Sequence, residues 1–131
     1  MLVDTNVLVD VLENDQDWAD WSIAQLQAQS KVHNLSINPI IYSELSLTFS
    51  TVESLDQALD GMALRLLEIP RPALFLAGKA FVRYRQHGGG KTNVLPDFFI
   101  GAHAAVSRLP LLTRDVTRYK RYFPSVLLIT P

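Results

Sequence analysis

The stretch Met1-Leu2-Val3-Asp4-Thr5-Asn6-Val7-Leu8-Val9 decides the fold class of this chain. A short apolar run ends in a carboxylate, and a second apolar run begins after two further polar residues. We interpret Leu2–Asp4 as a buried strand and the residues after it as a turn that leads into a helix. A carboxylate enclosed by apolar residues needs a partner if it is buried. Asp4 is therefore the first candidate functional residue.

Short apolar strands alternate with helical patterns along the rest of the chain. We predict further strands at Val32–Ile37, Leu67–Ile69, Leu111–Thr113 and Val126–Ile129, with a polar and basic connection between the last two. Caps and apolar stripes predict helices from Asp15 or Asp17 to about Gln29, from Pro39 to about Phe49, from Ser54 through Leu66, from Leu74 to Tyr84 and from Pro96 to about Ser107. This alternation predicts an α/β fold with a central, mostly parallel sheet of about four to five strands flanked by helices. The 131 residues are expected to form one domain over residues 1–131.

The composition excludes several classes of protein. The chain contains no cysteine, which excludes a disulfide scaffold, an iron–sulfur cluster, a thiolate zinc site and a cysteine nucleophile. Its longest stretch without a charged residue, Val32–Ser43, is well short of the ~20 residues that a membrane-spanning helix needs. The first residues show neither a basic start nor a long apolar run, so we expect no signal peptide, no membrane association and a cytoplasmic location.

The charges are unevenly distributed along the chain, although the net charge is only −1. Residues 1–60 hold ten of the thirteen acidic residues and one basic residue, whereas residues 61–131 hold three acidic and eleven basic residues. The two parts therefore carry −9 and +8. Such an asymmetry is consistent with an anionic partner, and equally with two interleaved halves whose charges cancel locally.

Four carboxylates occupy the positions at which a parallel α/β sheet binds its ligands, beyond the carboxyl ends of the strands. Asp4 ends the first strand, Asp115 follows the Leu111–Thr113 strand, Asp97 begins a helix, and Glu44 lies one turn into another. If they converge, their mutual repulsion requires a cation, and hard oxygen ligands select Mg²⁺ or Mn²⁺. Hydrolysis of a phosphodiester is the natural reaction for such a site.

Three of these carboxylates also have an ordinary structural interpretation. Asp97 after a proline is typical of a helix cap, Glu44 of a solvated helix face, and Asp115 of a turn. Only the combination of positions favours a common site.

Four blocks of the sequence together resemble the signature motifs of the PIN-domain ribonucleases, and among these the VapC toxins of type II toxin–antitoxin pairs. The blocks are Val3-Asp4-Thr5-Asn6-Val7-Leu8, Tyr42-Ser43-Glu44-Leu45, Leu95-Pro96-Asp97-Phe98-Phe99-Ile100-Gly101-Ala102 and Leu112-Thr113-Arg114-Asp115. The resemblance covers essentially the whole chain and implies a PIN-like fold. It also implies metal-dependent endonucleolytic cleavage of RNA, with Mg²⁺ as the cofactor and Mn²⁺ as a substitute.

The resemblance further implies roles for individual residues. The catalytic, metal-binding carboxylates would be Asp4, Glu44, Asp97 and Asp115. The neighbouring polar residues, which we expect to orient the carboxylates or a water molecule by hydrogen bonding, are Thr5, Asn6 and Thr113. For Asn6 and Thr113, hydrogen bonds within a turn are an equally good explanation. Phe98, Phe99 and His103 are bulkier than the residues expected in the third block, and we interpret His103 as a packing or interface residue.

The expected partners follow from the same resemblance. The substrate would be RNA, commonly transfer or ribosomal RNA in related toxins, and a cognate VapB-like antitoxin and a homodimer are expected. A water molecule, rather than the ribose 2′-hydroxyl, would attack the phosphate and leave a 5′-phosphate and a 3′-hydroxyl. The basic residues that we predict to contact RNA are Arg85, Lys91 and Arg114. The aromatic residues that are candidates for stacking on bases are Tyr119, Tyr122 and Phe123.

Other interpretations fit the sequence less well. Gly90-Lys91-Thr92 superficially matches a phosphate-binding loop, but Arg85 occupies a required glycine position and a helical pattern precedes the motif. A haloacid-dehalogenase-like phosphatase needs a second aspartate where Asn6 stands. A response-regulator receiver needs an acidic pair and a lysine pattern that are not matched. The remaining alternative is a non-catalytic PIN-like module that binds RNA or protein.

Overall fold

The computed structural model describes residues 1–131. The protein is organised around a sheet of five short strands, all of which pair in parallel. The strands are β1 (Leu2–Val3), β2 (Ser36–Ile37), β3 (Arg65–Leu66), β4 (Leu111–Leu112) and β5 (Leu128–Ile129), and their order in the sheet is β3-β2-β1-β4-β5. The central strand β1 aligns Leu2 with Ser36 on one side and with Leu111 on the other. The predicted α/β class and parallel sheet are therefore confirmed.

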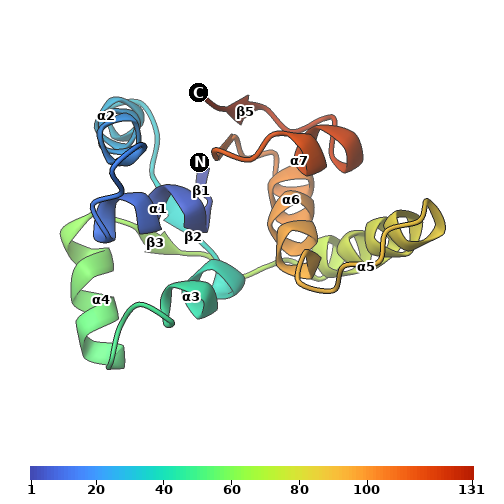
Figure 1. Ribbon diagram of the computed structural model, residues 1–131, viewed down its shortest axis with the longest axis horizontal. Helices are drawn as coiled ribbons and strands as arrows, with labels where there is room; N and C mark the ends of the chain where they lie inside the picture. Colours follow the sequence, from blue (N-terminus) through green and yellow to red (C-terminus); the bar gives the residue numbers. More distant parts are fainter.

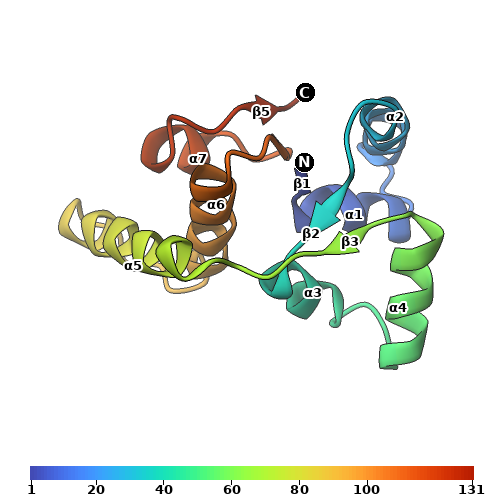
Figure 2. The ribbon, with the colours of Figure 1, turned by 180° about the vertical axis from the view of Figure 1, so that it is seen from behind.

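Seven helices flank this sheet. They are α1 (Thr5–Leu12), α2 (Ala19–Ser30), α3 (Pro39–Leu45), α4 (Val52–Gly61), α5 (Arg71–Gln86), α6 (Leu95–Ser107) and α7 (Thr117–Tyr122). Figure 1 shows α1 to α4 on one side of the molecule and α5 to α7 on the other, with both chain termini near each other. The view from behind in Figure 2 shows residues 67–70 crossing from β3 to α5, which extends away from the sheet beside α6.

Two helix starts illustrate how local sequence sets these elements. Asn38 caps α3, because its side-chain oxygen accepts hydrogen bonds from the backbone N–H groups of Ile40 and Ile41 at 3.1 and 3.0 Å. Pro39 occupies the first turn of this helix, as predicted. Thr51, rather than the predicted Ser54, caps α4 by accepting a hydrogen bond from the Ser54 N–H at 3.1 Å.

Several predicted boundaries are wrong. The turn expected after Asp4 is helix α1, and part of the polar connection before β5 is helix α7. The predicted strand Leu67–Ile69 lies two residues earlier, because α4 ends at Gly61 and Ala63 turns the chain with a φ of 55°. Strand β2 is limited to the last two residues of the predicted Val32–Ile37, and α3 ends at Leu45 instead of Phe49.

The core lies on both faces of the sheet and includes Leu2, Ile37 and Leu112 from the strands, all fully buried. Helix α6 approaches α7 closely, since a Cβ atom at Gly101 would lie 2.3 Å from the Phe123 ring. His103 is buried with its Nδ1 3.1 Å from Asn38 Nδ2, which agrees with its interpretation as a packing residue. None of the helices is both long and apolar enough to cross a membrane.

Candidate functional site

Two buried polar side chains, Asp4 and Thr113, lie at the carboxyl ends of β1 and β4, where the strand order reverses. Val3 pairs with Leu112, so the residues that follow them, Asp4 and Thr113, are neighbours. Thr113 Oγ1 donates a 2.7 Å hydrogen bond to Asp4 Oδ2. A reversal of strand order leaves a crevice at the sheet edge that is the usual ligand site of parallel α/β folds.

Asp4 is the most buried carboxylate of the site, with only 4% of the residue exposed. Its Oδ1 accepts a 2.7 Å hydrogen bond from the Thr5 N–H, which caps helix α1, and its Oδ2 also accepts a 3.0 Å bond from the Tyr119 hydroxyl. Burial raises the pKa of Asp4 to about 7, and the nearby charge of Asp97 adds to the rise, while the hydrogen bonds oppose it. A cation beside this carboxylate would keep it ionised at neutral pH.

Asp97 lies in the first turn of α6 and is connected to Asp4 through Tyr119, whose hydroxyl is also 3.5 Å from Asp97 Oδ1. Burial and the negative charge of Asp115 raise the pKa of Asp97, and the positive charge of Arg118 opposes this rise. Arg118 Nη1 forms an ion pair with Asp97 Oδ2 and lies 3.8 Å from Asp115 Oδ2. The Arg118 guanidinium therefore bridges two of the four predicted carboxylates.

Glu44 reaches the site from α3. Its Oε1 accepts a 2.7 Å hydrogen bond from Thr5 Oγ1. Burial raises the pKa of Glu44, and the charge of Asp97 raises it further. Thr5 thus connects the two predicted carboxylates of the amino-terminal half, through its N–H to Asp4 and through its hydroxyl to Glu44.

Asn6 and Thr113 join the ends of the two central strands. Asn6 Nδ2 donates to Thr113 Oγ1 at 3.4 Å, and Asn6 Oδ1 accepts from the Arg114 N–H at 3.3 Å. Thr113 Oγ1 also accepts from the Asp115 N–H at 3.0 Å. Thr113 is fully buried, so these bonds satisfy its hydroxyl and hold the loop after β4 against Asp4.

The four predicted carboxylates therefore share one end of the sheet, although no group of three or more acidic or histidine side chains is close enough to form a ready-made metal site. The charge of Asp97 acts on both Asp4 and Glu44, and that of Asp115 acts on Asp97. The donors are hard oxygen atoms without nitrogen or sulfur ligands, which suits Mg²⁺. The donor set therefore fits a divalent ion, and in this structure the Arg118 guanidinium supplies positive charge beside Asp97 and Asp115.

Two residues of this site were not predicted to belong to it. Arg118 was not among the predicted site residues and Tyr119 was a candidate for base stacking, but Arg118 pairs with carboxylates and Tyr119 is fully buried. Arg118 follows Asp115 by three residues at the start of α7, and this short spacing is the signal that can reveal the approach of the two side chains. Phe123 is also buried, against Gly101, so Tyr122 alone of the three aromatics is partly exposed.

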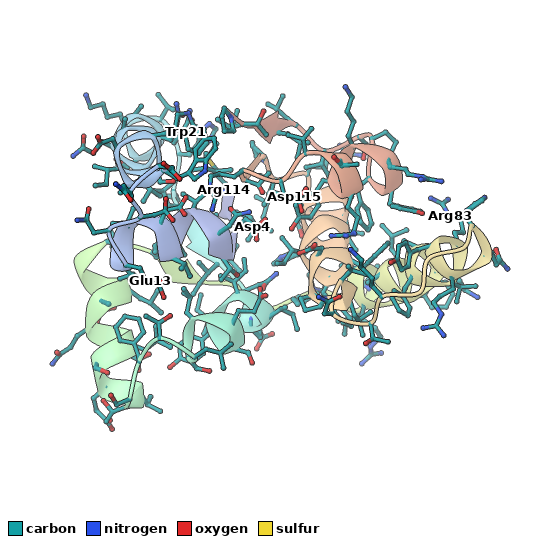
Figure 3. All side chains as sticks on the ribbon, viewed as in Figure 1. Asp4, Glu13, Trp21, Arg83, Arg114 and Asp115 are labelled. Carbon is teal, nitrogen blue, oxygen red and sulfur yellow. The ribbon has the colours of Figure 1, made fainter.

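Arg114, predicted to contact RNA, is instead engaged within the protein. Its guanidinium donates to both carboxylate oxygens of Asp10 at 2.6 and 2.9 Å and lies 4.9 Å from the Trp18 ring centre. Asp10 also accepts a 2.8 Å bond from Ser22 Oγ. Figure 3 shows Asp4, Arg114 and Asp115 grouped between α1 and α7, and Arg83 far along α5. We therefore expect Arg114 to stabilise the fold rather than to contact RNA.

Arg85 and Lys91 are exposed. Arg85 lies near the end of α5 with its guanidinium 5.7 Å from the Phe81 ring centre, and the Lys91 N–H donates to the Tyr84 hydroxyl at 3.2 Å. Their role in binding RNA stays a prediction.

Comparisons with known proteins give a family and a set of similar folds. A family model described as the PIN domain matches residues 1–122. A comparison with curated protein sequences finds no significant match.

Three solved structures illustrate the likeness of fold. A chain in VapBC2 from Rickettsia felis bound to a promoter DNA fragment has a TM-score of 0.74 and 22% identity, over 98% of this chain and 96% of that chain. A chain in DNA-bound VapBC from Salmonella typhimurium has a TM-score of 0.71 and 17% identity over the same shares. A chain in a toxin–antitoxin complex from Klebsiella pneumoniae has a TM-score of 0.62 and 25% identity, over 96% of this chain and 94% of that chain.

Proposed function

The chain belongs to the PIN domain family, and from this premise we propose that it is a metal-dependent endoribonuclease that acts as the toxin of a type II toxin–antitoxin pair. One observation carries the proposal. Carboxylates from four separate segments share the end of the sheet at which the strand order reverses, and the pKa values of Asp4, Glu44 and Asp97 are all raised by burial and by a neighbouring carboxylate. Clusters of carboxylates with raised pKa values are typical of catalytic sites.

The metal ligands in this proposal are Asp4, Glu44, Asp97 and Asp115, with Mg²⁺ as the ion and Mn²⁺ as a substitute. When bound, the ion supplies positive charge that stabilises the phosphate in the transition state and lowers the pKa of a water molecule. The protein's own residues hold the carboxylates in place. Thr113 and Tyr119 fix Asp4 through its Oδ2, and Thr5 fixes Glu44 through its Oε1.

Proton transfer is assigned to Glu44. Asp4 has both carboxylate oxygens in hydrogen bonds and is nearly inaccessible, whereas Glu44 is partly exposed and accepts only the Thr5 hydroxyl. One of its two carboxylate oxygens accepts the Thr5 hydroxyl, and the other is free of hydrogen bonds and can take up a proton from an attacking water. Because water rather than the ribose 2′-hydroxyl attacks, the products carry a 5′-phosphate and a 3′-hydroxyl.

The partners are proposed from the similar structures. Those solved structures are described as VapBC or toxin–antitoxin complexes, and we propose a VapB-like antitoxin for this chain as well. A homodimer and a transfer or ribosomal RNA substrate belong to the same proposal.

The test is to incubate the protein, freed of any antitoxin, with total cellular RNA in Mg²⁺ or Mn²⁺ and to map the cut positions. Discrete cuts are expected that disappear in EDTA and in Asp97→Asn. The matched control, Asp60→Asn, replaces an exposed aspartate of α4 and is expected to cut normally.

The alternative is a non-catalytic module that binds RNA or protein. It is favoured by one observation, the bridging of Asp97 and Asp115 by Arg118, which neutralises the cluster without a metal. This alternative would be supported if the folded protein does not cut RNA and if calorimetry detects no binding of Mn²⁺.

A further inference from the structure

A cavity of about 170 Å³ lies directly beside the acidic cluster and shares two residues with it. Its lining comes from α5, α7 and the loop after β4, and consists of Tyr84, Asp115, Thr117, Arg118, Arg121 and Tyr122. Asp115 and Arg118 are the residues that also belong to the cluster. The cavity therefore opens where a substrate would extend from the carboxylates.

Two tyrosine rings form an aromatic corner in this cavity. The Tyr84 and Tyr122 rings meet edge to face, with ring centres 6.1 Å apart and planes at 78°. Both rings pack against Phe98, which is fully buried, with centres at 5.5 and 5.2 Å. The corner is thus held by the core, while both tyrosines remain partly exposed. Aromatic faces held in this way are what unpaired bases stack on.

Positive charge surrounds the aromatic corner. Arg118 and Arg121 line the cavity, and the guanidinium groups of Arg121 and Arg83 lie 5.4 and 5.9 Å from the Tyr122 ring centre. The one acidic residue of the lining, Asp115, is paired with Arg118. A ligand for this cavity therefore combines an aromatic ring with a negative charge.

We propose that this cavity binds the base of a single-stranded RNA nucleotide next to the cleaved phosphate, with the base against Tyr122 and the phosphate near Arg121. The inference rests on the proposed function and specifies how its substrate is held. A cation that replaces Arg118 at Asp97 and Asp115 would release the guanidinium toward the same phosphate. Binding of the metal and binding of RNA would then reinforce each other.

The test measures binding without cleavage. Fluorescein-labelled hexanucleotides of adenosine and of uridine are titrated in EDTA with the full chain, and fluorescence anisotropy reports the affinity. Tyr122→Leu is expected to weaken binding about tenfold, because leucine removes the aromatic ring on which the base stacks. Tyr122→Phe keeps the aromatic face and is expected to retain the affinity. Phe75→Leu is the matched control, since Phe75 is an exposed aromatic residue of α5 with Lys79 5.2 Å from its ring centre, outside the cavity.

A second pair of variants keeps the test valid if Tyr122→Leu does not fold. Arg121→Gln is expected to weaken RNA binding and to lower the salt dependence of the affinity by about one counterion. Lys120 lies on the same helix but outside this cavity, so Lys120→Gln is expected to retain more of the RNA affinity and more of its salt dependence. The inference is overturned if Arg121→Gln and a folded Tyr122→Leu bind RNA as tightly as the unmodified chain. It is also overturned if the unmodified chain shows no saturable binding. Selective loss of binding in these variants, without any cleavage in Mg²⁺, supports the cavity and contradicts the proposed nuclease activity.

Discussion

Arg118 forms an ion pair with Asp97 and so places one of the chain's own positive charges inside a cluster of carboxylates. The same guanidinium lies 3.8 Å from Asp115, so it occupies the space between two of the proposed metal ligands. The positive charge of Arg118 thereby opposes the rise in the pKa of Asp97 that burial and the charge of Asp115 cause.

Arg118→Gln is therefore expected to strengthen Mn²⁺ binding about tenfold, because a charge-assisted pair of roughly 1.5–3 kcal/mol no longer competes with the ion. Isothermal titration with Mn²⁺ measures this directly. Lys120→Gln is the control, because it also removes one positive charge from α7 but breaks no ion pair to Asp97. It shows how much the loss of one nearby positive charge alone changes Mn²⁺ binding. Equal or weaker Mn²⁺ binding by Arg118→Gln would show that the arginine does not compete.

Thr113→Val is expected to destabilise the fold by about 1–3 kcal/mol, because it removes the hydroxyl that donates to the buried Asp4 carboxylate. Urea denaturation in EDTA measures the change. Thr113→Ser retains the hydroxyl and is expected to recover most of the stability. If the valine and serine variants are equally stable, the hydrogen bond to Asp4 contributes nothing measurable.

The raised pKa of Asp4 predicts a pH dependence of stability. The folded-state pKa of about 7 lies above the ordinary value of 3.8 for an aspartate, so between these values the folded protein binds more protons than the unfolded chain. The stability contributed by protonated Asp4 is thus greatest at low pH and is lost as the pH rises toward 7. Thermal unfolding is measured in EDTA at several pH values. The Tm of the natural chain is expected to fall more steeply with rising pH over this range than the Tm of Asp4→Asn. Identical pH profiles would contradict the raised pKa.

Arg114→Ala is expected to destabilise the fold by about 3 kcal/mol, because it leaves the buried Asp10 carboxylate with only Ser22. Arg71→Ala, which removes an exposed arginine from the start of α5, is expected to change stability little. The affinity for RNA is expected to stay unchanged at a temperature where the variant is folded. Loss of RNA affinity without loss of stability would restore Arg114 as an RNA contact.

The ends of β1, β2, β4 and β5 were predictable from the sequence to within one residue, because apolar runs and the polar residues after them are local features. The convergence of Asp4 and Asp115 follows from parallel pairing, and the structure indeed places them at one edge of the sheet. Amphipathic helices were predictable for the same reason, and Pro39 marked a helix start correctly.

Features that depend on long-range contacts were not predictable in this way. The partner of Arg114 lies 104 positions earlier, and Tyr119 reaches Asp4 across 115 positions, so no local pattern distinguishes them from surface residues. Strand β3 is exposed and lies at the sheet edge, where its residues show neither alternation nor an apolar run. The strand was therefore predicted at the nearby apolar stretch Leu67–Ile69 instead.

The central claim, that the carboxylate cluster cleaves RNA with a divalent ion and a water nucleophile, is tested most directly by the chemistry of the product ends. An RNA cut by the protein in Mg²⁺ is ligated to adaptors that require a 5′-phosphate or a 3′-hydroxyl, in parallel with an EDTA sample. We predict ligatable 5′-phosphate and 3′-hydroxyl ends in Mg²⁺ and none in EDTA. Ends that carry a 2′,3′-cyclic phosphate, or cuts that persist in EDTA, would contradict the account.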